Sequence, residues 1–375
     1  MSLLKTSQAW LTRQIRGADP VSCLSVTLRR GRTGARRTLR YLGILGPATL
    51  AAAVVLGGCS APAAAPATSG TGSEHSLTLG EAQTAYGAYV TASTAAAKQG
   101  DAAQGLAIVA DAQWSILHAQ YAALSVSGTP VTQYSYGTPV FYVPAQSSYP
   151  QWFMVAVPTS TVAGGQPGSA VNTLMVFVRS AQNEPWTLDG SAALDQPLPA
   201  LARDSDGYAI KVSTTDSSLL LQPNIVGPTQ AAVVDEGPTA PAAAVMGSGP
   251  LTTELYAQQA AQGNAATARG LSYQWLLEGA AFAQWELRTA DGGALVLYTM
   301  YLNTITEHPG NLAGSPVSVP ANFSPLITTS ARVGRHGATA NWTFEFAAVD
   351  PPQTAHGAKV EVIAGSGAPT YGRGF

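Results

Sequence analysis

The apolar positions of residues 77–127 recur every three to four residues, which is the spacing of a helix that packs one face on a core. Thr78 and Glu81 have the spacing of a capping box and predict the start of a first helix. Asp101 is placed to cap a second helix, which the turn-forming sequence SVSGTP ends at residues 125–130. The folded part of the chain is therefore predicted to open with two helices.

Beyond Pro130 the apolar and polar positions alternate, and Tyr, Val, Phe and Trp stand in short runs broken by Pro and Gly. This period of two predicts β-strands. The runs QYSYGTPVFYVP, YPQWFMVAVP, NTLMVFVRS and PWTLDGS are joined by connections too short for crossover helices, so we expect an antiparallel sheet. A connector follows within residues 208–250, with a short helix around residues 229–235.

The second half of the chain repeats this layout. A helix is predicted over residues 251–270, and alternating runs follow it, two of them joined by the hairpin-turn signal Asp-Gly-Gly at residues 291–293. VFYVPAQSSYPQWFMVAVP matches the pattern of AFAQWELRTADGGALVLYTMYL, and NTLMVF matches that of NWTFEF. We interpret this as an internal duplication.

These patterns predict an α+β protein of two related domains. In each domain we expect an N-terminal helix or helices packed on a curved antiparallel sheet. The first domain is predicted over residues 77–215 and the second over residues 251–375, with residues 216–250 as the connector.

The chain in front of the first helix has the pattern of an export signal. RRGRTGARRTLR carries six arginines and no acid, and the apolar run that follows it is uncharged. The run ends in Leu-Gly-Gly-Cys at residues 56–59, which resembles a bacterial lipobox, where the cysteine is lipidated and cleavage follows on its amino side. We therefore predict a lipoprotein signal over residues 1–58, a lipidated Cys59, and an Ala/Pro/Ser/Gly tether over residues 59–76. An uncleaved membrane-spanning anchor is the alternative.

Two features of this leader leave alternatives open. Residues 1–28 carry no periodic pattern, and we interpret them as lying before the true start or as an extended n-region. Arg36 and Arg37 resemble a twin-arginine signal, with general secretion as the alternative. Either route places the mature chain at the outer face of the cytoplasmic membrane.

Removal of the signal changes the charge of the chain. Nine of the 19 basic residues and one of the 21 acidic residues precede Cys59, which leaves ten basic and twenty acidic groups and a net charge of about −10. This balance argues against nucleic acid as a partner and against a basic membrane-binding face. Cys59 is the one cysteine left in the mature sequence, which excludes an intrachain disulfide, a thiolate metal cluster and a cysteine nucleophile.

Longer segments of the sequence resemble a known family. LTLGEAQTAYGAYV, QGLAIVADAQW, PQWFMVAVP, TQAAVVDEGP, LRTADGGALVLYTMYLNT and NWTFEFAAVDPP resemble segments of a family of uncharacterised actinomycete lipoproteins. The resemblance covers essentially all of residues 77–375; it implies a location at the cell surface and no particular activity. The order of helices and sheet separately resembles the NTF2-like or cystatin-like fold.

Seven aromatic residues on or beside the predicted strands are candidates for a ligand pocket. A concave sheet lined by Trp and Tyr would suit a lipid, a glycan or a peptide. Packing in the core against the helices is the alternative, and we favour it. Only one face of each strand can point inward, so some of these residues must lie outside. The candidates are Tyr142, Trp152, Trp186, Trp275, Trp285, Tyr301 and Trp342.

Two groups of residues could bind a metal. Asp204 and Asp206 have the central spacing of a calcium loop, but no terminal glutamate completes it, and a polar turn is favoured. His308, His336 and His356 could form a zinc or hydrolytic site if their loops converge; their spacing matches no ligand template, and exposed loop histidines are favoured. We predict no catalytic residue and no cofactor, and the sequence has no Gly-x-Ser-x-Gly elbow.

Several classes of function stay open. We favour a non-catalytic envelope lipoprotein that is held in membrane lipid through Cys59 and binds an envelope protein or a cell-wall component. The alternative is an extracytoplasmic hydrolase or metal-dependent enzyme that uses the C-terminal histidines and acids. A further alternative is a carrier of a small ligand, such as a lipid, a glycan or a peptide.

Overall fold

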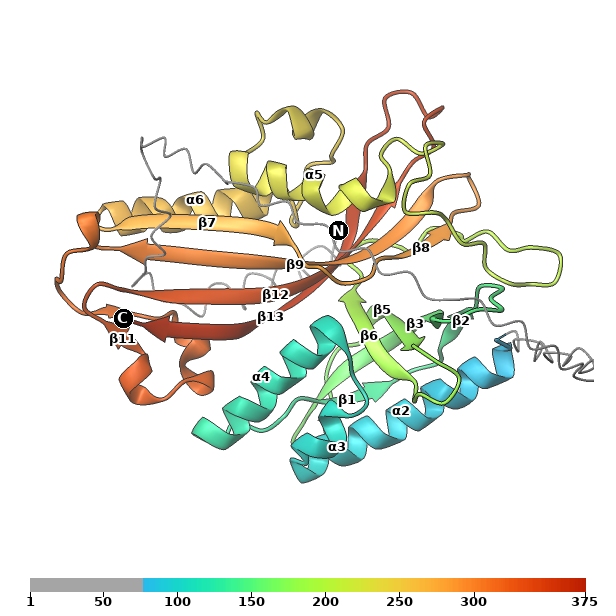
Figure 1. Ribbon diagram of the computed structural model, residues 1–375, viewed down its shortest axis with the longest axis horizontal. Helices are drawn as coiled ribbons and strands as arrows, with labels where there is room; N and C mark the ends of the chain where they lie inside the picture. The colour runs from blue at the N-terminus through green and yellow to red at the C-terminus, as the bar shows by residue number, and fades with distance from the viewer. Residues whose placement is uncertain (1–76) are drawn as a thin grey trace, which may run out of the picture. The chain divides into compact units, whose positions relative to one another are not determined.

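The structure, a computed structural model, describes residues 77–375, in which helices precede each of two large antiparallel sheets (Figure 1). The protein is of the α+β class, as the sequence predicts. All of these residues belong to one compact unit that contains both sheets. No helix in this part of the chain is long and apolar enough to cross a membrane.

The first helix, α2 (Leu79–Gln99), begins at the predicted capping box. The Thr78 hydroxyl accepts a hydrogen bond from the Glu81 backbone N–H at 3.2 Å, and the Glu81 carboxylate accepts one from the Thr78 backbone N–H at 2.9 Å. The helix ends at Gly100, whose φ of 68° is left-handed.

The second predicted helix is two helices, so the prediction of one continuous helix is wrong. The chain forms the short α3 (Ala102–Leu106), breaks, and begins again as α4 (Asp111–Ser127). At the break the backbone pairs with a strand instead of continuing the helix. Ile108 accepts a hydrogen bond from the Leu188 N–H at 3.0 Å, and Ala110 donates one to the Leu188 carbonyl at 2.9 Å.

The first sheet follows α4. It consists of β1 (Gln133–Tyr136), β2 (Val140–Tyr142), β3 (Gln151–Ala163), β4 (Gln166–Pro167), β5 (Val171–Arg179) and β6 (Thr187–Ala193). Its order is β1-β3-β5-β6, and β2 and β4 also pair with β3. The predicted alternating runs therefore form one antiparallel sheet.

The connector contains a longer helix than the sequence predicts. In place of a short helix around residues 229–235, α5 (Pro223–Glu236) begins with a proline in its first turn, where the missing N–H costs no hydrogen bond. The turn η1 (Pro241–Ala244) and the predicted helix α6 (Thr253–Thr267) follow.

The second sheet has the strand order β7-β9-β12-β13, with β8 paired to β9. Its strands are β7 (Ser272–Gly279), β8 (Trp285–Arg288), β9 (Ala294–Glu307), β12 (Gly337–Asp350) and β13 (Glu361–Gly374). Short elements lie between β9 and β12: η2 (Pro309–Asn311), β10 (Val317–Ser318), η3 (Ala321–Leu326), η4 (Thr329–Ala331) and β11 (Val333–Gly334). The predicted hairpin turn joins β8 to β9, with Gly292 at a φ of 91°.

The two sheets share one strand order. β1, β2, β3, β5 and β6 hold the same relative positions as β7, β8, β9, β12 and β13, and helices precede each set. The segments that match in sequence pattern therefore occupy equivalent places: β2 and β3 correspond to β8 and β9, and β5 corresponds to β12.

Three apolar cores follow from this arrangement. One lies between α2 and the first sheet and includes Tyr86 and Phe177. A second lies between the second sheet and helices α5 and α6, which cover one face of that sheet (Figure 1). The third joins the sheets to each other, where Trp152 of β3 meets Trp285 of β8 with ring centroids 5.2 Å apart. Both sheets thus pack together through the faces that point away from α2 and from α5 and α6.

Candidate functional site

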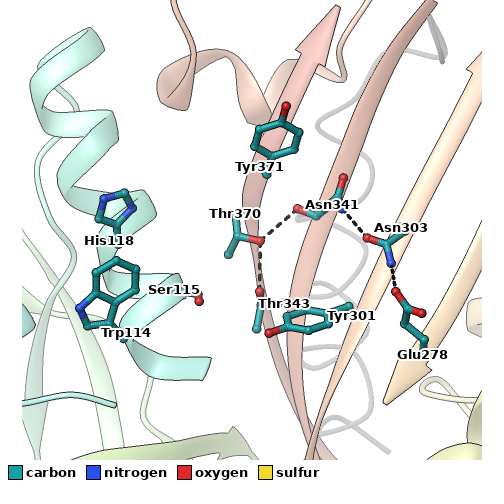
Figure 2. Close-up of a pocket in the computed structure, with 10 residues that line it drawn as sticks. All are labelled: Trp114, Ser115, His118, Glu278, Tyr301, Asn303, Asn341, Thr343, Thr370 and Tyr371. Atoms are coloured by element: carbon teal, nitrogen blue, oxygen red, sulfur yellow. Dashed lines mark hydrogen bonds between the residues drawn. The ribbon is translucent and has the colours of Figure 1, made fainter. Parts of the chain in front are cut away.

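A cleft of about 350 Å³ opens between α4 and the face of the second sheet that points away from α5 and α6 (Figure 2). We call it the α4 cleft; three residues of α4 and seven residues of β7, β9, β12 and β13 line it. Its volume lies within the range of about 300–1,000 Å³ that is typical of small-molecule sites. It is therefore large enough for a ligand.

The wall on α4 is aromatic. Trp114 and His118 lie one helical turn apart, and their rings stack with centroids 4.8 Å apart and planes 12° from parallel. Trp114 is 44 % exposed and is the one exposed tryptophan of residues 77–375. A side chain of this size gains free energy when it is buried, so its exposure opposite a cleft makes Trp114 a candidate contact for a ligand.

The wall on the sheet is polar because of the strand alternation. On β9 the even-numbered residues, such as Met300 and Leu302, are buried in the core beneath α5 and α6, which turns Tyr301 and Asn303 to the opposite face. The register of β12 places Asn341 directly opposite Asn303, and Thr343 opposite Tyr301. These pairs bring polar groups of neighbouring strands together on the cleft face.

A chain of hydrogen bonds crosses the strands on this face, and we call it the amide ladder (Figure 2). The Asn341 amide donates to the Asn303 carbonyl oxygen, and the Asn303 amide donates to Glu278 Oε1 at 2.6 Å. The side-chain oxygen Oδ1 of Asn341 in turn accepts a hydrogen bond from the Thr339 hydroxyl at 3.1 Å. The ladder thus runs over β12, β9 and β7.

Glu278 fixes the direction of the amide ladder. An ionised carboxylate only accepts hydrogen bonds, so Asn303 must turn its NH₂ group toward Glu278 and its carbonyl oxygen toward Asn341. Each NH₂ group uses one hydrogen within the ladder and carries a second one. The two amides are therefore held in one orientation as donors on the cleft face.

A cluster of carboxyl groups lies beside the inner end of the cleft. Glu345 follows Thr343 by two residues on β12, points to the same face and is fully buried. Its Oε2 accepts a hydrogen bond from the Gln113 side chain of α4, and its Oε1 has no partner within residues 77–375. Burial raises the pKa of Glu345 well above its usual range. Burial therefore favours the neutral, protonated form of Glu345.

Asp189 of β6 is the second member of this carboxyl cluster. It is buried, and its Oδ2 accepts a hydrogen bond from the Trp285 indole N–H at 2.7 Å. Burial raises the pKa of Asp189 to about 7, the Trp285 bond opposes this shift, and the carboxyl group of Asp111 adds to it by charge and by a hydrogen bond. Asp111 opens α4 with a left-handed φ of 45°, a strained conformation for a residue other than glycine.

The carboxyl cluster also influences the cleft. Burial raises the pKa of the cleft residue Tyr301, and the charges of Asp111 and Glu278 raise it further. Tyr301 is therefore a neutral hydroxyl group at physiological pH, able to donate and accept hydrogen bonds.

Of the seven aromatic candidates from the sequence, Tyr301 alone lines the α4 cleft. Three of the others are in apolar cores: Trp152 and Trp285 between the sheets, and Trp342 against Phe323. The remaining three are partly buried. Tyr142 and Trp186 pack under the guanidinium groups of Arg203 and Arg179, and Trp275 donates a hydrogen bond to the Val234 carbonyl at 3.0 Å.

The metal candidates are spread over separate places. Asp204 Oδ1 accepts hydrogen bonds from the backbone N–H groups of Asp206 and Tyr208, which is the pattern of a polar turn. The backbones of His308 and His336 are joined by a hydrogen bond, whereas His356 is exposed in the loop after β12. Within residues 77–375 no group of three or more His, Cys, Asp or Glu residues could hold a metal ion. Cys59 and the predicted tether lie outside the described residues.

Sequence reasoning missed most of the cleft residues, although some carried a signal. Gln113 occupies one of the positions that recur every three to four residues on the core-facing side of the helix. Trp114 is the next residue and therefore points away from that side. Asn303 and Asn341 are each the one asparagine of a strand whose other residues are mostly apolar or threonine. His118 carried no comparable signal, because nothing in the sequence places it beside Trp114 except their separation of four residues.

The fold and the cleft define an α+β protein in which a helix of the first half faces the sheet of the second half across a ligand-sized site. A family model described as Domain of unknown function (DUF8094) matches residues 74–372. The chain belongs to this family.

A relative from Streptomyces avermitilis is named "Uncharacterized lipoprotein" and is 27 % identical to this chain over 229 residues. The match covers 59 % of this chain and 64 % of the relative. The chain is thus similar to an uncharacterised lipoprotein of an actinomycete, which agrees with the family resemblance in the sequence.

Proposed function

We propose that this chain is a non-catalytic binding protein of the cell envelope, lipid-anchored through Cys59, and that its ligand binds in the α4 cleft. The observation that carries the proposal is the exposed Trp114, stacked on His118 and facing the amide ladder of the second sheet. Aromatic surface on one wall and oriented polar groups on the other are the usual composition of a binding site.

Sequence and similarity support the location. Residues 56–59 have the lipobox pattern, and the Streptomyces avermitilis relative is named a lipoprotein. The anchor holds the folded domain at the outer face of the cytoplasmic membrane, where its ligand is an envelope protein or a cell-wall component. The likeness of the fold to NTF2-like or cystatin-like domains stays a prediction.

A hydrolase is the second candidate function, and the carboxyl cluster favours it. Asp111 and Asp189 share a hydrogen bond, and the pKa of Asp189 is raised to about 7, which is the condition of an acid poised to give up a proton near neutral pH. However, Asp189 is 7 % exposed and already bound by Trp285, which leaves little access for a substrate. We therefore prefer the binding function.

Site-specific crosslinking in cells tests the binding function. A photoreactive amino acid replaces Ser115, which lines the cleft, and in a matched control it replaces Thr91, which is exposed on α2. We expect irradiation to attach an envelope component at position 115 and none at position 91. Equal capture at both positions, or none at either, would contradict a ligand site in the cleft.

A further inference from the structure

From the chemistry of the two walls we infer that the ligand of the α4 cleft is an uncharged glycan, bound with a sugar ring on the Trp114–His118 stack and its hydroxyl groups on the amide ladder. This inference rests on the proposed binding function and names its ligand class. It follows from three properties of the cleft: a flat aromatic wall, a wall of oriented hydrogen-bonding groups and a low number of charges.

The aromatic wall suits the face of a sugar ring. Pyranose rings carry several C–H groups on one face, and these pack flat against an indole ring. Trp114 and His118 stack nearly parallel, so the imidazole covers part of one indole face and holds the indole ring in place on the helix. A flat surface that is half exposed on one helix fits a ring better than it fits a flexible acyl chain.

The wall that carries the amide ladder suits the hydroxyl groups at the edge of the same sugar ring. Sugar hydroxyl groups both donate and accept hydrogen bonds, and the wall offers both functions. Asn303 and Asn341 supply fixed donors, Glu278 supplies an acceptor, and the hydroxyl group of Thr343 exchanges a 3.1 Å hydrogen bond with that of Thr370. Such a row across neighbouring strands matches the spaced hydroxyl groups of a ring rather than a single polar headgroup.

The charges of the cleft argue against an anionic ligand. Glu278 is the one acidic residue among the lining residues, and the mature sequence carries an excess of acidic groups. Phosphate-rich polymers and other polyanions are therefore repelled. The protein offers no cluster of arginine or lysine side chains in the cleft that would reverse this.

Two other ligand classes fit the geometry less well. Apart from its tyrosines, the sheet wall has no apolar side chain. A lipid tail would therefore bury the polar groups of the amide ladder without offering them hydrogen-bond partners. An extended peptide is bound most often along a free sheet edge, where its backbone continues the ladder of strands. The α4 cleft lies instead on a sheet face, where side chains make the contacts.

The test is a titration of the mature lipidated protein in detergent micelles, followed by calorimetry and by tryptophan fluorescence. The probes are short, uncharged, β-linked oligomers of glucose and of N-acetylglucosamine, compared with polygalacturonate, a fatty acid and a short peptide. We expect at least one neutral oligomer to bind and Trp114→Ala to weaken it by about tenfold or more, through loss of the stacking surface. Val126→Ala, on the same helix and 40 % exposed but outside the cleft lining, should bind normally.

Asn303→Ala gives a second, independent variant, and its unfolding temperature shows whether its fold is intact. Weaker binding of the oligomer by a folded Asn303→Ala protein would support the inference. Unchanged binding by both Trp114→Ala and Asn303→Ala, or tighter binding of the polyanion, the fatty acid or the peptide, would overturn it. If no oligomer binds while position 115 still captures an envelope component, the glycan is wrong and the binding function stands. If neither result appears, both proposals fail.

Discussion

Gln113 of α4 donates a hydrogen bond to the buried carboxyl group of Glu345 on β12, which lies 232 positions further along the chain. The bond joins the helical layer of the first half to the sheet of the second half at the inner end of the α4 cleft. The bond gives a fully buried carboxyl group a neutral amide as its partner, and burial raises the pKa of Glu345, which favours its protonated form.

Replacement of Glu345 should show this neutral state. Glu345→Gln keeps the shape and the acceptor, and should lower the free energy of unfolding by about 1 kcal/mol or less. Glu345→Ala leaves a cavity and an unpaired Gln113 amide, and should lower it by about 3 kcal/mol. Chemical denaturation at neutral pH measures both values. An equal loss of unfolding free energy in the two variants would show that the hydrogen-bond acceptor at position 345 does not contribute to stability.

The raised pKa of Asp189 predicts a loss of stability with rising pH. The unfolded chain releases this proton near its ordinary pKa of 3.8, whereas the folded protein holds it up to about pH 7. The folded state therefore binds more protons between these values, and its stability is fully present below about pH 4 and declines until about pH 7. Asp350, with a pKa raised to about 7 by burial, adds to the same slope.

Asp189→Asn tests this directly, because the amide mimics the protonated carboxyl group. Relative to wild type, the variant should gain about 2–4 kcal/mol of unfolding free energy as the pH rises through this window. Asp216→Asn is the matched control. The pKa of Asp216 is lowered to about 2 by hydrogen bonds from Ser218 and Arg288, so its contribution is present above its ordinary pKa of 3.8 and lost as the pH falls toward 2. A flattened slope in the control rather than in Asp189→Asn would refute the assignment.

Glu278 should matter for ligand binding and little for stability. In Glu278→Gln the side chain at position 278 can donate as well as accept, so Asn303 loses its fixed orientation. We expect the affinity for a bound neutral oligosaccharide to fall about three- to tenfold, with an unchanged unfolding temperature. Glu184→Gln, an exposed position between β5 and β6, serves as the matched control. Equal affinities of the two variants for the oligosaccharide would show that Glu278 does not contribute to its binding.

The lipid anchor makes a further prediction. Cys59→Ala removes the sulfur that carries the lipid, and the protein should move from the membrane fraction to the soluble fraction of the envelope. Detergent phase partition of the two proteins measures the shift. Continued membrane association of the variant would instead favour the uncleaved anchor. The fold of residues 77–375 should be unaffected, because the helices and sheets described there do not include Cys59.

Local signals in the sequence predicted much of the fold. The capping box at Thr78 and Glu81 and the hairpin turn before β9 depend on neighbours a few residues apart, and both are where the sequence places them. The break before α4 depends on backbone bonds to Leu188, a residue about 80 positions away, which no helical period reveals. Long-range pairing therefore overrode the helical pattern there.

The candidate site was harder to predict for the same reason. Asn303 and Asn341 meet only because β9 and β12 pair in one particular register. Trp114 faces them only because the two sheets pack together, in a core that includes Trp152 and Trp285. The aromatic residues of the sequence suggested a site on the strands. Most of those residues pack in cores, whereas the exposed Trp114 is on a helix.

The repeated strand order has a consequence for how such a site arises. In the first half the face of the sheet that points away from α2 is covered by its counterpart, but the counterpart has longer strands: β12 has 14 residues and β5 has nine. At about 3.3 Å per residue, this difference leaves a shelf of roughly 16 Å beyond the shared core. Two sheets with strands of equal length would have covered each other's facing surfaces completely. The unequal strand lengths of the two sheets therefore leave room for a ligand, and longer β5 and β6 strands would bury this exposed part of the second sheet in the core between the sheets.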